Sequence, residues 1–223
     1  MQKFDTPSPV TAVLDIPAGR IRFIAADRTD TCVEILPADT SKSRDLKAAE
    51  QTTVTYADGI LRIEAAAAKN RILGNSGSVE VTVQLPAGSR IEAKTAAAEL
   101  RGVGRLGDVT FEGAQGSVKL DETAGARLTL QAGDILVGRL TGPAQISTQK
   151  GDLNIAEATS GTVELRTESG DITIGAARGT SATLDAGTAY GRIHNTLQNT
   201  AGATAGLNIQ ATTSYGDITA RSL

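Results

Sequence analysis

Glycine recurs at nearly constant spacing through the second half of this chain. From residue 107 onward, the intervals within one series are 9, 9, 8, 9, 9, 10, 9 and 9 residues. The series consists of Gly107, Gly116, Gly125, Gly133, Gly142, Gly151, Gly161, Gly170 and Gly179. A fixed period is the signature of a repeat architecture, in which small structural units stack on one another. The period therefore restricts the fold more strongly than composition does.

A short stretch of alternating apolar and polar residues follows the glycines. In "GDLNI", Leu153 and Ile155 flank Asn154, and in "GDITI", Ile172 and Ile174 flank Thr173. Alternation over so few residues predicts short strands with one buried face. Two strands and two turns account for about 18 residues, which is one coil of a solenoid.

One coil cannot bury its apolar face alone, whereas stacked coils pair equivalent strands at ~4.8 Å. We therefore predict an all-β fold, a parallel β-solenoid or right-handed β-helix of ~18-residue coils, over residues 86–223. About seven coils fit this range at that length. The right hand follows from the preference of parallel crossovers. Glycine at each corner permits positive φ, and Asp or Ser beside it can accept backbone hydrogen bonds.

Residues 1–85 follow a different pattern. "TAVLDIPAGRIRFIAA" and "TCVEILPA" predict strands, and Asp58-Gly59 predicts a hairpin turn. A short helix is expected near residues 43–51, with Ser43 able to cap it. We predict that residues 1–85 form an N-terminal β segment, continuous with the solenoid, which caps one end. An uncapped end would expose apolar surface.

The composition excludes several classes of protein. The net charge is −3 with six aromatic residues in total, three Tyr and three Phe. A nucleic-acid-binding surface would require a basic stripe, so no nucleic-acid partner is expected. Cys32 is the only cysteine, so an intramolecular disulfide is excluded, and we expect a buried small side chain rather than a reactive thiol.

The N-terminal sequence "MQKFDTPSPV" shows no apolar core of a signal peptide, and no run of 18 apolar residues occurs in the chain. We therefore predict neither a secretory signal nor a membrane span. A cytoplasmic location follows, or a cell-surface location if the sequence is trimmed from a longer chain.

The repeated "GDITI" form and the closing "TSYGDITARSL" resemble the bacterial DUF4097 family, described as candidate adhesins with β-strand repeats. The segment "LPAGSRIEAKTAAAELRGVGRLGDVTFEGAQGSV" is similar to its actinobacterial members. The resemblance covers residues 5–223. It implies repetitive β structure and an adhesin-like role, and it supplies no catalytic motif to assign to this chain.

Aspartates at equivalent corners are the first candidates for chemistry. If the coils stack, Asp134, Asp152 and Asp171 lie ~5 Å apart, where like charges raise a pKa or attract a cation. Three alternatives remain: corner geometry, a weak cation site, or an acid/base pair for glycan cleavage. Calcium-binding rolls need G-G-x-G-x-D, which this series does not show. We favour corner geometry and expect no metal, no other cofactor and no catalytic residue.

Two tyrosines also occupy matching corners, in Tyr190-Gly191 and Tyr215-Gly216. Exposed tyrosines can stack on sugars, whereas buried ones would close the C-terminal end. His194, the only histidine, should point outward because Ile193 takes the inward position. The binding candidates are Tyr190, Tyr215, Arg192 and His194.

These features favour a non-catalytic scaffold or adhesin-like module that binds through flat side faces. The expected partner is a protein, a second copy of the chain or a cell-envelope polymer, a glycan included. Outward positions are Lys119, Asn154 and Thr173 on one face, and Thr129, Ser147, Glu164 and Thr183 on the other. The alternative is a carbohydrate-active β-helix enzyme or glycan-binding protein that uses the corner aspartates.

Overall fold

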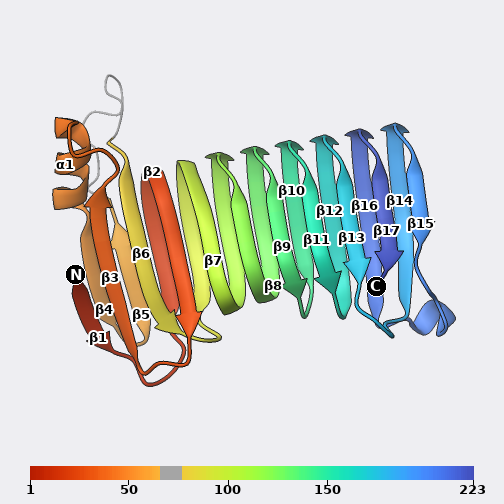
Figure 1. Cartoon of the computed structure of the whole chain (residues 1–223), viewed down its shortest axis with the longest axis horizontal. Helices are drawn as coiled ribbons and strands as arrows, with labels where there is room; N and C mark the ends of the chain where they lie inside the picture. Colours follow the sequence, from red (N-terminus) through yellow and green to blue (C-terminus); the bar gives the residue numbers. More distant parts are fainter. Residues whose placement is uncertain (66–76) are drawn as a thin grey trace.

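The protein is a rod of β-strands stacked side by side (Figure 1). The computed structural model describes residues 1–65 and 77–223. The strands run across the rod, and the α-helix of the described residues lies at the N-terminal end of it (Figure 1). This is the parallel β-solenoid that the sequence predicts.

Strands dominate the described residues. The elements in chain order are β1 (Gln2–Asp5), β2 (Thr11–Ala26), β3 (Asp30–Pro37), α1 (Ser43–Gln51), β4 (Thr53–Ala57), β5 (Ile60–Glu64), β6 (Val79–Pro86), β7 (Arg90–Gln115), β8 (Val118–Ala132), β9 (Ile135–Leu140), β10 (Ala144–Lys150), β11 (Leu153–Ala158), β12 (Gly161–Ser169), β13 (Ile172–Ala176), β14 (Ala182–Tyr190), β15 (Ile193–Thr196), the 3-10 helix η1 (Gly202–Thr204), β16 (Leu207–Tyr215) and β17 (Ile218–Ser222).

Parallel pairing in register builds two long faces. Face 1 includes β10, β12, β16 and β14, and face 2 includes β9, β11, β13, β17 and β15. The long strands β7 and β8 turn the corner and contribute to both faces. From Arg90 to Ser222 the pairings define seven coils among the described residues, as expected.

Inward side chains stack into aliphatic ladders between the faces. On face 2, Leu153 pairs with Ile135 on one side and Ile172 on the other, and all three are at most 1% exposed. Outward neighbours such as Asn154 are exposed. Burying such ladders removes apolar surface from water at about 25 cal/mol per Å², which drives the coils to stack.

The order of coils in the rod differs from the order in the chain at both ends (Figure 1). Near the N-terminus, β2 lies between β7 on one side and both β5 and β6 on the other. Near the C-terminus, β16 lies between β12 and β14, and β17 lies between β13 and β15. The stack of parallel strands thus begins before residue 86. The predicted domain division at residues 85 and 86 stays a prediction.

Antiparallel strands and the helix close the N-terminal end. β3 pairs antiparallel with β1 and β6, and β4 pairs antiparallel with β5 through the predicted turn, where Asp58 and Gly59 both have positive φ. The helix lies where expected, but its N-cap is Lys42 rather than Ser43, because Ser43 is already the first helical residue. Asp45 is its buried residue, and Oδ1 accepts the N–H of Ser78 at 3.0 Å.

Candidate functional site

The corner aspartates form a hydrogen-bonded series along one edge of the rod. Oδ1 of Asp134 accepts the backbone N–H of Asp152 at 2.9 Å, and Oδ1 of Asp152 accepts that of Asp171 at 2.8 Å. Asp171 does the same for Asp217, and Asp217 for Arg192, each at 2.8 Å. Each carboxylate therefore satisfies the backbone of the next corner, which is the corner geometry that we favour.

The last corner of this series carries a cation in place of an aspartate. Nη2 of Arg192 lies 2.8 Å from Oδ2 of Asp217, and this hydrogen bond lowers the pKa of Asp217 and raises the pKa of Arg192. Within residues 1–65 and 77–223, no group of three or more His, Cys, Asp or Glu side chains could hold a metal ion. The carboxylates of this edge organise the backbone of successive corners.

A threonine three residues before the corner glycine completes the corner, and it was not among the predicted corner residues. Its hydroxyl donates to the carbonyl oxygen of the glycine in the neighbouring coil. The pairs are Thr148 with Gly133 at 3.5 Å, Thr167 with Gly151 at 3.1 Å, Thr213 with Gly170 at 3.1 Å and Thr188 with Gly216 at 3.0 Å. The signal was present as T-x-x-G in "TQKGD", "TESGD", "TSYGD" and "TAYGR".

Two adjoining grooves lie on the outer side of face 1. The larger has a volume of about 540 Å³ and spans β7, β8, β10, β12 and β16. The second, of about 410 Å³, shares Arg127, Gln145 and Glu164 with the first. Together they make one polar surface that crosses several coils. We call this surface, centred on Arg127, Gln145 and Glu164, the face 1 groove.

Side chains from three successive coils are linked across the face 1 groove. Nη1 of Arg127 donates to Oε1 of Gln145 at 3.0 Å, and Nε2 of Gln145 donates to Oε2 of Glu164 at 3.3 Å. Glu112 and Arg166 line the larger groove beside them. With Arg90, Asp108 and Gln210, which also line it, the face 1 groove offers three guanidinium groups, three carboxylates and two amides.

The structure brings together three of the outward residues that the sequence predicts. Thr129, Ser147 and Glu164 all line the larger groove. Thr183 lies on the same face in another row, where its hydroxyl is 2.8 Å from Oδ1 of Asn208. On face 2, Lys119, Asn154 and Thr173 align in one row with Leu136 between the first two.

Arg127 and Gln145 were not among the predicted outward residues of this face. They occupy the same outward positions as Glu164 in the two preceding coils. The alternation of inward and outward residues along each strand would therefore have predicted that both side chains line this face.

The tyrosine candidates meet at the C-terminal end of the rod. Tyr190 and Tyr215 are paired in register, and their rings stack with centroids 4.9 Å apart and planes at 4°. They are 68% and 59% exposed, so they do not close the end by burial. Arg192 follows at the same corner, whereas His194 lies on β15 beside Thr219 and is exposed. The structure thus joins three of the four binding candidates.

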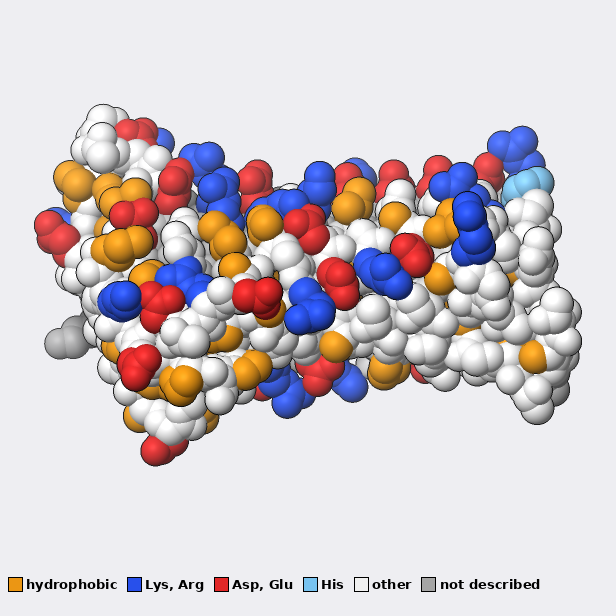
Figure 2. Space-filling view, turned by 60° about the horizontal axis from the view of Figure 1, so that its bottom comes forward, with side chains coloured by type: hydrophobic (Ala, Val, Ile, Leu, Met, Phe, Trp, Pro, Cys, Tyr) orange, Lys and Arg blue, Asp and Glu red, His pale blue; other side chains and the backbone are white. Residues whose placement is uncertain are grey.

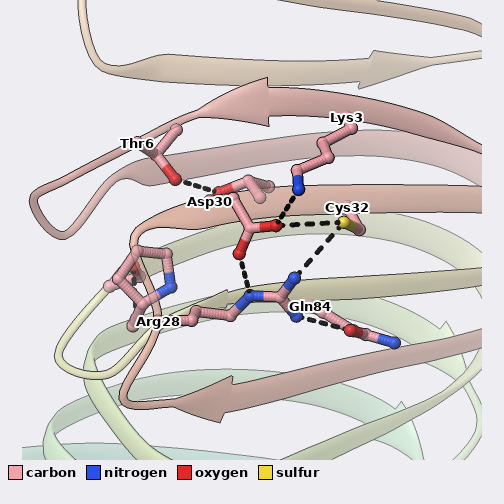
Figure 3. A network of polar contacts seen from close by, with 9 residues as sticks. Lys3, Thr6, Arg28, Asp30, Cys32 and Gln84 are labelled. Carbon is pink, nitrogen blue, oxygen red and sulfur yellow. Dashed lines mark hydrogen bonds and ion pairs between the residues drawn. The ribbon is translucent and has the colours of Figure 1, made fainter.

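A polar network fastens the N-terminal strands (Figure 3). Asp30 on β3 lies 3.0 Å from Nζ of Lys3 on β1 and 2.8 Å from Nε of Arg28. Arg28 also donates to Gln84 on β6 and, at 3.2 Å, to Sγ of Cys32. Hydrogen bonds from Arg28 and then Lys3 hold the pKa of the Asp30 carboxyl far below its ordinary value. Cys32 is buried, as predicted, with polar groups around its sulfur.

The chain belongs to the Toastrack DUF4097 family, whose sequence profile matches residues 75–221. This confirms the resemblance in the corner sequences. The narrower similarity to actinobacterial members stays a prediction. No curated protein matches the chain.

Three solved structures are similar to the chain at low identity. A candidate cell adhesion protein from Clostridium sporogenes is 12% identical with a TM-score of 0.42, over 100% of this chain and 98% of that one. Candidate adhesins from Bacteroides fragilis and Parabacteroides distasonis are 11% and 12% identical, with TM-scores of 0.44 and 0.49. Each match covers 98% of this chain and 95% of the other.

Across the described parts of the chain, none of the helices has the length and apolar character to cross a membrane.

Proposed function

We propose that this protein is a non-catalytic, adhesin-like module whose face 1 groove binds an extended polar polymer of the cell envelope. One observation carries the proposal. Two open grooves adjoin on one face and share Arg127, Gln145 and Glu164, so a continuous polar surface runs across several coils. The three similar structures are described as candidate adhesins, a role named for those proteins.

The chemistry of the groove favours a polar polymer over a globular protein partner. Protein interfaces concentrate their binding energy in buried aromatic and arginine anchors within an apolar centre. The lining of the face 1 groove has no aromatic residue and is rich in hydroxyl, amide and charged groups. A polymer that carries both amino and carboxylate groups matches the paired guanidinium and carboxylate groups there.

The enzymatic alternative has less support. An acid/base pair needs a carboxyl group with a shifted pKa, free to reach a substrate. At the corners, Oδ1 of Asp134, Asp152 and Asp171 already accepts a backbone N–H. One oxygen of each of these carboxylates is therefore already used by the backbone of the corner.

The location of the protein, cytoplasmic or at the cell surface, stays a prediction.

Cosedimentation with purified cell-wall sacculi, whose glycan strands carry peptides, tests this role. We expect the chain to sediment with sacculi. We expect Arg127→Glu to weaken binding at least about tenfold, because it removes a guanidinium group that would face the carboxylates of the polymer and puts a negative charge in its place. The matched control is Lys119→Glu, which makes the same charge change on face 2. It should bind as the wild-type chain does.

Two results would count against the groove. If the wild-type chain stays in the supernatant at low ionic strength, the polymer is the wrong partner. If Arg127→Glu and Lys119→Glu weaken binding equally, net charge and not the face 1 groove is responsible. Circular dichroism of both variants verifies that the fold is intact.

A further inference from the structure

The two ends of the rod are finished differently. At the N-terminal end, antiparallel strands and α1 cover the last parallel coil (Figure 1). At the other end, β14 pairs with β16 and β15 pairs with β17, and the described residues supply no partner for their outer edges. Two strand edges, one on each face, are therefore open.

Backbone donors point outward from the corner between these two edges. In each earlier coil, the corner glycine donates its N–H to the coil that follows it in the rod. The bonds run from Gly151 to Ser169 at 2.9 Å, from Gly170 to Tyr215 at 2.9 Å and from Gly216 to Tyr190 at 3.0 Å. Gly191 is the equivalent glycine of the last coil, so its N–H points away from the rod.

Apolar groups accompany the open edges. Ile193 is in register with Ile218, which is fully buried, yet Ile193 is 46% exposed. Tyr190 stacks on Tyr215 through one ring face and is 68% exposed. An open strand edge with uncovered inward positions is a template for pairing with another chain.

The opposite corner of the last coil is already occupied. Ala182 donates its N–H to the carbonyl oxygen of Gln198 at 3.1 Å, and Oγ of Ser181 accepts the N–H groups of Thr200 and Ala201 at 3.1 and 3.0 Å. The segment between β15 and β16 therefore covers that corner. The open surface, which we call the end face, comprises the outer edges of β14 and β15 and the Gly191 corner.

We propose that the end face is the interface of a tail-to-tail dimer with a second copy of this chain. Shape favours this occupant, because an identical coil presents two edges at the same separation, whereas one added strand would cover only one. Charge favours it too: in residues 182–196, Asp185 and Arg192 are the charged side chains and they cancel.

A two-fold axis at the end face makes the paired strands antiparallel. Because the same surface of both copies makes the contact, it is isologous, and assembly through the end face closes at a dimer. The inference is independent of the face 1 groove.

Sedimentation velocity over a range of concentrations tests the interface. We expect a concentration-dependent dimer that Ile193→Lys weakens at least about tenfold, because the contact would bury an unpaired ammonium group. Leu136→Lys is the matched control, since Leu136 is 37% exposed in the middle of face 2 and should leave dimerisation unchanged. Melting temperatures verify that both variants fold.

A second variant keeps the test decisive if Ile193→Lys unfolds. Asp185 is exposed, so Asp185→Lys should leave the monomer intact. It should weaken the dimer, because each end face would then carry two cations and no anion, and the two copies would repel one another. A chain that is monomeric at every concentration overturns the proposal, even if it captures a strand of another protein. A dimer that survives both end-face variants, or is lost equally in Leu136→Lys, overturns it as well.

Discussion

The corner glycines carry the strictest steric requirement in the rod. A Cβ atom on Gly170 would lie 2.0 Å from the carbonyl oxygen of Gly151, and φ of Gly170 is +152°. The same holds for Gly151 and Gly216, where an added Cβ atom would lie 2.1 and 2.0 Å from the carbonyl oxygen of the glycine in the neighbouring coil. Only glycine permits both the backbone conformation and the close approach of successive coils.

Alanine substitutions should separate these two requirements. Gly170→Ala, with both clash and positive φ, should lower the free energy of unfolding by about 3 kcal/mol or more. Gly179→Ala, with φ of +77° and open space around it, should cost about 1 kcal/mol. Gly187→Ala, where a Cβ meets nothing within 4 Å, should be nearly neutral. Urea denaturation measures all three, and equal losses would contradict the steric account.

Part of the corner chemistry could be predicted from single residues. The regular glycines and aspartates indicated a corner because both residue types favour turns. The threonine hydroxyls, such as that of Thr167, escaped notice because threonine also suits ordinary strand positions. Only the pairing of coils reveals that Thr167 lies beside the carbonyl oxygen of Gly151.

At the scale of elements, β1, β3 and β6 are joined by one carboxylate. Asp30 accepts hydrogen bonds from Arg28 and Lys3, and Arg28 reaches Gln84 on β6. The charged form of Asp30 is therefore favoured in the folded chain, and its pKa is lowered. A lowered folded-state pKa stabilises the fold above the unfolded pKa of about 4, and this contribution is lost as pH falls.

The pH dependence of Asp30→Asn should reveal this contribution. At pH 7 we expect the variant to be less stable than the wild-type chain in urea, because the ion pairs are absent. Below about pH 4 Asp30 becomes protonated in the unfolded chain while the folded chain still holds it charged, so the stabilisation falls and the difference from the variant should narrow. A difference that stays constant from pH 7 to pH 3 would show that the carboxylate charge does not fasten these strands.

The elements themselves were largely predictable, because alternation reports which face of a strand is buried. The ladder of Leu153, Ile172 and Ile218 follows directly from it. The hydrophobicity of Ile193 likewise indicated an inward position, which the register with Ile218 confirms. Its exposure was not predictable, because burial depends on whether another coil lies beyond it.

At the scale of the whole molecule, stacking order could not be derived from the repeat. Every coil contributes similar aliphatic residues to the ladders, so the repeat period indicates which strands can pair but not the order in which the coils stack. The structure places β2 inside the N-terminal end and β16 and β17 inside the C-terminal end (Figure 1). Charged side chains of both signs lie along the rod, and few occur near the β14 and β15 end on the face seen in Figure 2.

This order predicts an unusual pattern of hydrogen exchange. In a solenoid that stacks in chain order, the C-terminal coil would fray first, because it has a neighbour on one side only. Here β16 and β17 have neighbours on both sides, so their amides should exchange more slowly than those of β14 and β15. Exchange should be measured at a concentration low enough for the chain to be monomeric, since a tail-to-tail dimer would also protect the amides of β14 and β15. Faster exchange in β16 and β17 than in β14 and β15 would mean that the coils follow the chain, and the end face would then belong to the wrong strands.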